Sequence, residues 1–227
     1  MDDMRVRRAG DAALVLECPA RLDPAINARV ISARARMVER CGDRIRDAVV
    51  GYHTLTVYFD PLQVDAAWLE QQLADAGRDA SAETSTSGAL IDVPVCYGGT
   101  LGPDLAEVAT SIGRTERDVV DLHLSRVYRV FVVGFVPGFA YMGPVAPALH
   151  LPRRSTPRTR VPPGSVAIAA GQTGIYPMET PGGWHLIGRT PVRPFDEARS
   201  EPVLFRPGDR VRFHAITQAE YDRHTTW

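Results

Sequence analysis

The 227-residue chain carries 27 acidic and 26 basic side chains, for a formal net charge of -1. A charge this close to zero gives no reason to expect a nucleic-acid-binding or membrane-surface protein. All 26 basic side chains are arginine, so a Walker-type phosphate-loop lysine, a Schiff-base lysine and a biotinyl-lysine are excluded, and any anion must be bound by guanidinium or backbone N–H groups.

Cysteine usage and the start of the chain indicate a reducing compartment. Cys18, Cys41 and Cys96 are far apart, odd in number and without a C-x-x-C pair, so a disulfide framework is not expected. The N-terminus lacks the apolar segment of a signal peptide, and no apolar run approaches membrane-spanning length. We therefore expect a cytoplasmic protein with neither a membrane nor a nucleic-acid partner.

Short strands and amphipathic helices alternate over residues 1–80. Asp23-Pro24 is typical of a helix N-terminus, and the apolar side chains that follow recur every three or four residues up to Gly42. Strands and helices combined on one sheet indicate a ferredoxin-like α/β sandwich, which we predict for residues 1–80. The expected elements are a hairpin with its turn at Gly10-Asp11, helices over 23–42 and 65–76, and strands at 45–50 and 55–59.

Residues 81–89 contain no large apolar side chain and predict a linker to a second domain, residues 90–227. The strand that opens this domain contains Pro94, which suits the edge of a sheet better than its centre. Asp104 is expected to cap one helix, and residues 115–118 resemble a capping box that opens another.

Residues 134–194 hold 9 glycines and 11 prolines, a density that is usual in disordered segments. Apolar runs at 166–170 and 184–187 argue against disorder and predict strands joined by tightly specified turns. Together with the β-rich runs at 127–133 and 210–213, they predict a barrel-like C-terminal half. The sequence therefore belongs to the α+β class.

No carboxylate side chain occurs in the 57 residues between Asp121 and Glu179. The six arginines in this stretch must find acceptors elsewhere in the fold, in a partner or in a ligand. A solvated basic loop is one interpretation. The other is a site for a carboxylate, carbonate or phosphate, because neighbouring prolines stiffen the loop and a rigid guanidinium loses less entropy on binding. The arginines are Arg126, Arg129, Arg153, Arg154, Arg158 and Arg160.

Glycine and aromatic residues are interleaved in three segments of the same region. The glycines of residues 134–143 let a ligand or a partner backbone approach closely, while the aromatic rings could line a pocket or fill the barrel end. Gln172 and Tyr176 offer hydrogen bonds, and Gly182-Gly183 permits backbone geometry that other residues forbid. Both interpretations, ligand pocket and packed interior, stay open.

The remaining candidates give weak signals. His123 on its expected helix could be a general base, but a single histidine is more often structural, and the same holds for His185. Ser165 lies outside any G-x-S-x-G motif and is a weak candidate nucleophile. The scattered histidines lack zinc-ligand spacing, so no metal site is expected. The residues alone thus indicate an anion-compatible site without a complete catalytic apparatus.

Six ordered motifs between residues 134 and 191 resemble one family. They are Gly134-Phe-x-Pro-Gly-Phe-x-Tyr141, Pro157-Arg158, Val161-Pro-x-Gly-Ser165, Gly171-Gln-Thr-Gly-Ile-Tyr-Pro177, Pro181-Gly-Gly-Trp184 and Gly188-Arg-Thr-Pro191. Pro94-Val-x-Tyr-Gly-Gly99, Gly102-Pro-Asp-Leu105 and His123 extend the similarity upstream. The chain is similar to the KipI family, the PxpB subunits of 5-oxoprolinase, formerly called allophanate hydrolase subunit 1 and related to carboxyltransferase subdomains C and D.

The resemblance implies a ferredoxin-like N-terminal domain and a cyclophilin-like C-terminal barrel. It also implies a KipA/PxpC-like partner subunit, with the active site where the two meet. With a third subunit, PxpA, the family's pair opens 5-oxoproline, a small carboxylate, to glutamate with ATP as cofactor. Two alternatives remain: half of a biotin-dependent carboxyltransferase in allophanate or urea metabolism, and an inhibitor that binds a sensor histidine kinase. Pro163, Met142 and Thr180 depart from the family pattern without removing a polar site group.

These observations define a candidate site. We expect substitution of Arg158 by alanine to cost activity far more than stability, because a solvent-facing arginine rarely stabilises a core. The expected cleft is lined by Arg154, Arg158, Gln172, Tyr176 and Arg189, with Trp184 as a wall and His123 close by. The candidate catalytic residues are His123, Arg158, Gln172, Tyr176 and Arg189, and the candidate substrate-binding residues are Phe135, Pro137, Gly138, Phe139, Tyr141, Arg154, Ser165, Gly182, Gly183 and Trp184.

Overall fold

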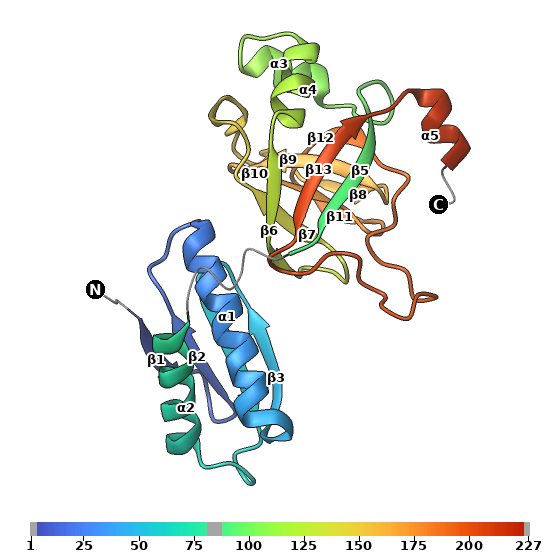
Figure 1. Ribbon diagram of the computed structural model, residues 1–227. Coiled ribbons are helices and arrows are strands. Elements are labelled where there is room, and N and C mark those ends of the chain that lie inside the picture. Colours follow the sequence, from blue (N-terminus) through green and yellow to red (C-terminus); the bar gives the residue numbers. More distant parts are fainter. Residues whose placement is uncertain (1–3, 81–87, 225–227) are drawn as a thin grey trace. The chain divides into compact units, whose positions relative to one another are not determined.

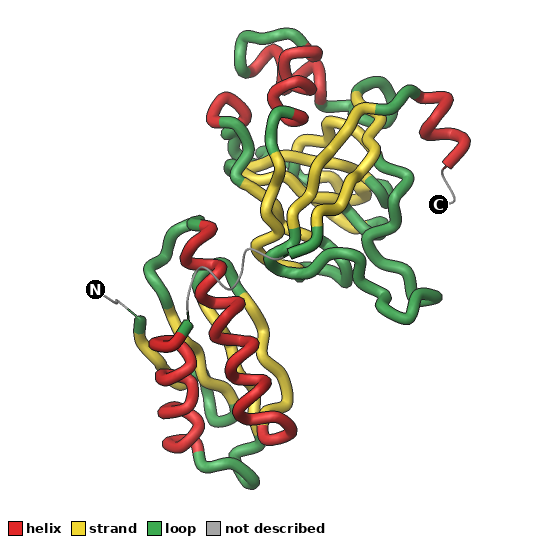
Figure 2. Tube along the Cα trace, in the orientation of Figure 1, coloured by secondary structure: helices red, strands yellow, loops and turns green. Residues whose placement is uncertain are grey.

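The computed structural model describes residues 4–80 and 88–224 and divides into two compact units, Met1–Gly88 and Ala89–Trp227 (Figures 1 and 2). Each unit is built around its own hydrophobic core. Most of the predicted linker, residues 81–89, lies outside the described residues, so its conformation stays a prediction.

The first unit is a four-stranded antiparallel sheet with both of its helices on one face (Figure 1). The predicted hairpin, helices and strands are all present. In chain order the elements are β1 (Arg5–Arg8), β2 (Ala13–Glu17), α1 (Pro24–Cys41), the 3-10 turn η1 (Gly42–Arg44), β3 (Ile45–Val50), β4 (Thr54–Phe59) and α2 (Ala66–Asp79).

The N-terminal hairpin completes this sheet in an unexpected way. In a ferredoxin-like β-α-β-β-α-β unit the strand beside the first comes last in the chain, after the second helix. Here the strand order is β1-β2-β4-β3, so β1 occupies that place and comes first in the chain. The sandwich is therefore confirmed, with its fourth strand supplied by the hairpin.

Local signals fix the long helix α1 of this unit. The Asp23 carboxylate accepts a hydrogen bond from the Ala25 backbone N–H at 2.8 Å, and Pro24 occupies the first turn. Val30 and Met37 of the same helix are fully buried against the sheet residues Leu55 and Val57. Capping thus sets where the helix begins, and burial of its apolar face fixes it on the sheet.

The second unit is a closed barrel of seven strands in the order β10-β7-β6-β13-β5-β12-β9, with a separate two-stranded sheet, β8 with β11 (Figure 1). The predicted α+β class, sandwich followed by barrel, is therefore confirmed. The strands are β5 (Leu90–Tyr97), β6 (Val127–Val133), β7 (Ala140–Gly143), β8 (Arg158–Val161), β9 (Ser165–Ala169), β10 (Gln172–Ile175), β11 (Thr180–Gly182), β12 (His185–Arg189) and β13 (Arg210–Ala215). The helices are α3 (Leu105–Ser111), α4 (Glu116–Leu124), the 3-10 turn η3 (Pro147–Leu149) and α5 (Gln218–His224). No helix of the described residues is long and apolar enough to cross a membrane.

Pro94 does not mark a sheet edge, because β5 lies between β13 and β12 in the closed barrel. At Pro94 itself, however, β5 is paired with a neighbouring strand on one side only. β13 pairs with β5 from Leu90 to Val95, whereas β12 pairs only with Cys96 and Tyr97. Pro94 therefore lies where β5 has one partner, and its missing N–H removes no hydrogen bond on the β12 side.

Capping explains α4 but not α3. Thr115 and Asp118 form the predicted capping box, in which each side chain accepts a hydrogen bond from the other residue's backbone N–H. Asp104 stands at the N-cap of α3, yet its side chain makes no capping hydrogen bond. The prediction that Asp104 caps this helix is wrong, and its carboxylate has a different use.

Candidate functional site

Four aromatic rings pack against one another on the outer surface of the barrel. Phe139 is the centre of this aromatic cluster, with its ring centroid 4.7 Å from Tyr141, 5.1 Å from Tyr176 and 5.6 Å from Trp184, each in an edge-to-face arrangement. Edge-to-face contacts of this kind stabilise beyond the area they bury. The cluster is thus a rigid element rather than a set of independent surface rings.

Strand β9 makes room for the aromatic cluster. All five of its residues are buried, because both faces of the strand are covered. Val166 and Ile168 point into the barrel core, and Ala167 and Ala169 lie under the aromatic cluster. Small side chains on the outer face allow the large rings to approach the sheet closely.

Burial separates the aromatic residues into two groups. Phe139, Tyr176 and Trp184 are 2%, 2% and 5% exposed, so for them the packed-interior interpretation holds. Phe135 is 62% exposed, and its backbone φ is 72°, a left-handed conformation that a bulky residue rarely adopts. The candidate surface of this region is therefore formed by Phe135 and the partly exposed Tyr141.

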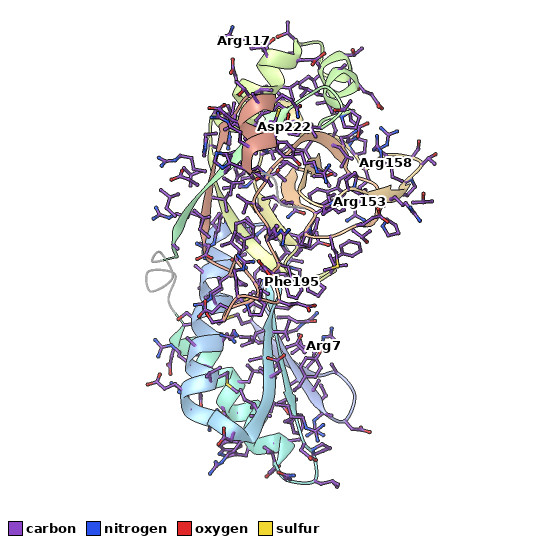
Figure 3. All side chains as sticks on the ribbon, turned by 90° about the vertical axis from the view of Figure 1, so that its right-hand side faces the viewer. Arg7, Arg117, Arg153, Arg158, Phe195 and Asp222 are labelled. Carbon is purple, nitrogen blue, oxygen red and sulfur yellow. The ribbon has the colours of Figure 1, made fainter. Side chains whose placement is uncertain are left out.

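The loop that presents Phe135 is held tightly. The Gly134 N–H donates to the Phe139 carbonyl at 3.0 Å and closes the turn between β6 and β7. A Cβ on Gly138, whose φ is 83°, would lie 2.7 Å from the Phe195 Cβ. Gly138 is therefore needed for close packing on Phe195 (labelled in Figure 3), while the neighbouring Pro137 is exposed.

Asp104 joins three segments of the barrel unit through a carboxylate whose residue is only 3% exposed. Its backbone N–H donates to the Leu186 carbonyl at 2.9 Å, and the Leu186 N–H donates to its Oδ2 at 2.7 Å. Arg158 binds the same carboxylate through two nitrogens, at 2.8 and 2.6 Å. Arg154 adds a third guanidinium contact at 3.1 Å. Bidentate pairing of this kind is directional and strong.

A second carboxylate completes this group, which we call the Asp104 cluster: Asp104, Glu107, Arg154 and Arg158. Glu107 of α3 accepts from Arg154 at 2.9 Å. Two acids therefore neutralise two arginines, and Arg160 lies 3.6 Å from Glu179. These three arginines find acceptors within the fold, and their predicted role in binding an anion stays a prediction.

Glycine is required where the Asp104 loop meets β12. A Cβ on Gly102 would lie 2.2 Å from the Ile187 carbonyl oxygen. The Gly98 N–H donates to that same oxygen at 3.1 Å. The backbone of residues 98–104 thus lies close against β12, and this places the Asp104 side chain next to Leu186.

Both tyrosines of the aromatic cluster remain protonated near neutral pH. Burial raises the pKa of Tyr176 to about 12, and a backbone hydrogen bond from Trp184 and the charges of Arg153 and Arg158 oppose this shift. Burial also raises the pKa of Tyr141, and Arg153 opposes that shift. These phenols are therefore hydrogen-bond donors rather than bases.

His123 does not belong to this surface. It is fully buried in the barrel core, where Tyr97 Oη lies 2.8 Å from Nδ1 and Thr173 Oγ1 lies 2.9 Å from Nε2. Because the Thr173 hydroxyl donates to the Ala167 carbonyl, Nε2 carries the proton and Nδ1 accepts from Tyr97. Burial lowers the pKa of His123 to about 3. The prediction of a general base beside the cleft is contradicted, because both ring nitrogens are occupied and no solvent reaches them.

Ser165 and Arg189 face each other across β9 and β12, at the end of the barrel next to residues 162–164. The Ser165 hydroxyl donates to the Pro162 carbonyl at 2.7 Å, and the Arg189 Nε donates to the Pro163 carbonyl at 2.7 Å. Ser165 is 2% exposed, so it stabilises this turn and is not available as a nucleophile.

The other predicted residues are distributed as follows. Strand alternation places Gln172 on the outer face of β10 together with Gly174, where an added Cβ would lie 2.9 Å from the Phe139 ring. The Arg154 N–H donates to the Gly183 carbonyl at 2.8 Å. The structure therefore brings Arg154, Arg158, Tyr141, Tyr176, Gly182, Gly183 and Trp184 to one region, and leaves His123 outside it. No group of three metal-ligating side chains occurs among the described residues.

Replacing Gly182 with alanine is expected to destabilise the barrel unit by about 1–3 kcal/mol, as overpacking usually does. The new Cβ would lie 2.3 Å from the Tyr176 hydroxyl oxygen and would displace that buried ring. Urea denaturation of the two chains measures the difference. Gly134→Ala is the matched control, because a Cβ there meets nothing within 4 Å; equal midpoints for Gly182→Ala and the natural chain would contradict the expectation.

The sequence did not predict Asp104 as an arginine partner, and it named Arg153 only among the arginines of a possible anion site, not among the candidate site residues. The available signal for Asp104 was its place in the Gly102-Pro-Asp-Leu105 motif, which a helix cap explains equally well. For Arg153 the sequence offers only its place among the four arginines at 153–160. Which of these four arginines lacks an acidic partner depends on the fold.

Residues 4–205 match the carboxyltransferase domain model, subdomains C and D. The chain belongs to this family. It is 42% identical over 216 residues to the B subunit of 5-oxoprolinase from Escherichia coli O157:H7, a match that covers 94% of this chain and 96% of that protein. The B subunit of 5-oxoprolinase from Bacillus subtilis is 33% identical over 231 residues, covering 96% and 95% of the two chains.

Solved structures support the same fold. The crystal structure of TTHA0988 matches with a TM-score of 0.80 and 35% identity over 93% of this chain, which spans 40% of that longer protein. The urea amidolyase of K. lactis matches with a TM-score of 0.77 at 18% identity, over 97% of this chain and 15% of that chain, and shows the fold alone. A putative urea carboxylase of Emericella nidulans is a distant relative, 23% identical over 207 residues, or 81% of this chain and 17% of that protein.

Proposed function

We propose that the chain is the B-type subunit of a 5-oxoprolinase, which opens the lactam of 5-oxoproline to glutamate at the expense of ATP together with a KipA/PxpC-like subunit and a PxpA-like subunit. The observation that carries the proposal is the similarity to the B subunits of two 5-oxoprolinases over nearly the whole of both chains. Because the proposed enzyme is assembled from several subunits, this subunit does not need to hold every catalytic group.

The geometry of the site supports a shared reaction. The aromatic cluster and the Asp104 cluster form a rigid, partly exposed surface with hydrogen-bond donors, but the candidate bases of this chain are occupied. His123 is buried, and the tyrosines are protonated. A group that activates water or binds phosphates would then come from the partner subunits. In the longer relatives the matching part is joined to further chain.

The test is an assay of reconstituted subunits. We expect ATP hydrolysis that depends on 5-oxoproline when this chain, the KipA/PxpC-like subunit and the PxpA-like subunit are mixed, with stoichiometric glutamate. Omitting any one of the three is the control and is expected to abolish the coupled reaction. A complete mixture that forms no glutamate would show that the proposal is wrong.

A carboxyltransferase half is the second candidate, because the matching family model describes a carboxyltransferase domain. With no lysine in this chain, biotin would be attached to another protein. The two functions separate in one experiment: bicarbonate- and biotin-carrier-dependent carboxylation of urea supports the carboxyltransferase, and carrier-independent glutamate formation supports the 5-oxoprolinase.

A further inference from the structure

Residues 152–154 are fixed beside the strand that carries Trp184. The Arg154 N–H donates to the Gly183 carbonyl at 2.8 Å, and His185 Nε2 donates to the Pro152 carbonyl at 2.9 Å. Arg153 lies between these two anchored residues, so its backbone is held next to Trp184. A guanidinium on a fixed backbone loses less entropy when it binds a ligand.

The two adjacent arginines differ in their partners. Arg154 is bound by Asp104 and Glu107, and its side chain is 24% exposed. Arg153 is exposed and forms no ion pair with any acid of the described residues. Of the three arginines Arg153, Arg154 and Arg158, Arg153 is therefore the one without an acid partner among the described residues.

The surroundings of Arg153 suit a small organic anion. Its backbone is held next to Trp184, which packs against Phe139 and Tyr141, so it lies beside the aromatic cluster. Figure 3 shows Arg153 and Arg158 projecting from the same side of the barrel unit. Tyr141 is partly exposed, and its ring lies 5.8 Å from that of Trp184. A cation and an aromatic surface are thus adjacent.

We propose that Arg153 binds the carboxylate of the small substrate beside the aromatic cluster, while Arg154 and Arg158 hold the surface in place. This inference rests on the proposed function. A carboxylate fits better than a triphosphate, because one guanidinium offers two parallel N–H groups to one carboxylate, whereas several phosphates need several cations. The other two arginines of this surface are already neutralised.

Arginine modification tests the proposal without requiring turnover. The full chain, alone and with its partner subunits, is treated with phenylglyoxal, and the modification rate of each arginine is followed by peptide mass spectrometry. We expect 5-oxoproline to slow modification of Arg153 at least fivefold, and ATP to leave it unchanged. Arg212, exposed on β13 and paired with Asp92, is the control and is expected to react at one rate throughout.

Kinetics of the assembled enzyme supply the second measurement. Arg153→Ala is expected to raise KM for 5-oxoproline at least tenfold with a smaller change in kcat, and Arg153→Lys to restore part of the loss. Arg212→Ala, on β13, is expected to keep the KM of the natural enzyme. Far-ultraviolet circular dichroism and the melting temperature establish that the variants fold.

Three results would overturn the proposal. Modification of Arg153 at an unchanged rate with 5-oxoproline excludes it from substrate binding, protection by ATP assigns it to a phosphate, and protection by the partner subunits alone assigns it to their interface. The proposed function fails separately. If no glutamate forms but 5-oxoproline still protects Arg153, the proposed function is wrong and the proposed binding site stands. If glutamate forms but 5-oxoproline does not protect Arg153, the proposed function stands and the proposed binding site is wrong.

Discussion

Replacement of Asp104 by alanine is expected to lower the free energy of unfolding of the barrel unit by about 3–5 kcal/mol, the usual cost of removing one partner from a buried ion pair. The substitution leaves the Leu186 N–H without its acceptor and Arg158 without both of its charged hydrogen bonds. The loss arises from groups left unpaired rather than from the net worth of the pair.

The measurement is urea denaturation followed by fluorescence. Trp184 lies in the barrel unit and reports its unfolding when Trp68 and Trp227 are replaced by phenylalanine in every chain compared. The midpoint of the Trp184 transition is expected to fall for Asp104→Ala, while the first unit, followed separately by circular dichroism, keeps its stability.

Arg158 provides the partner for a double-mutant cycle. Arg158→Ala alone is expected to be destabilising, because it leaves the buried Asp104 carboxylate with fewer donors; the expectation from the sequence, a loss of activity far more than of stability, is revised accordingly. Combining it with Asp104→Ala should cost less than the sum of the two. Arg212→Ala, which removes an exposed pair with Asp92, is the matched control and should leave the midpoint nearly unchanged. If the effects of Asp104→Ala and Arg158→Ala on the free energy of unfolding simply add, the two side chains are not energetically coupled and the expectation is wrong.

The helices and strands were predictable because their signals are local. Asp23-Pro24 caps and starts α1 within a few residues, and Thr115 with Asp118 forms a capping box regardless of what surrounds it. Asp104 has the same local signature and behaves differently. Its carboxylate is taken by Leu186 and by arginines some fifty residues along the chain, as the separations of 50 and 54 residues for Arg154 and Arg158 show. Local pattern cannot decide between a cap and a distant ion pair.

The order of β1 in the first sheet escaped prediction for a related reason. The sequence predicts a hairpin in residues 5–17. The position of β1 in the sheet, however, depends on which edge strand the other elements leave without a partner. Pro94 is a similar case. It indicates that β5 is paired on one side at this residue, but it does not show that the strand lies inside a closed barrel.

The site was predicted in part. Parts of the motifs at 134–191 lie together, as Tyr176, Trp184 and Gly182 do. Ser165 and Arg189 of the same motifs lie at the end of the barrel. The sequence could not distinguish paired from unpaired arginines, because the acids that pair with them, Asp104 and Glu107, lie outside the acid-free stretch. His123 carried a signal of burial that was not used: Val119, four residues before it on α4, is also fully buried, as expected for one inward face of a helix.

Lowering the pH from 6.5 toward 3 is expected to destabilise the barrel unit through His123. In the folded chain its pKa is about 3, below its ordinary value of 6.5, because burial opposes the charged form. Below pH 6.5 the unfolded chain therefore binds a proton that the folded chain does not, and stability falls by up to about 1.4 kcal/mol per pH unit until the folded histidine also titrates. Well above pH 6.5 the residue is uncharged in both states and contributes no slope.

The polar groups in contact with His123 do not titrate in this range. Tyr97 and Tyr128 have pKa values raised above 10 by burial, and Thr173 carries no charge. The slope between pH 6.5 and 4.5 can therefore be assigned by substitution. His123→Gln offers an amide N–H to Thr173 and a carbonyl to Tyr97, so it is expected to fold with reduced stability at pH 7 and a shallower dependence on acid.

Urea denaturation at half-unit steps from pH 7.5 to 4.5 measures this difference, again with Trp184 as the reporter of the barrel unit. His214→Gln, at an exposed position on β13, controls for the removal of a histidine as such and is expected to follow the natural chain. If His123→Gln and the natural chain lose stability in parallel as the pH falls, then His123 titrates in the folded state as it does in the unfolded one. The histidine would in that case be reachable by solvent, and a role for it as a base at the candidate surface would have to be considered again.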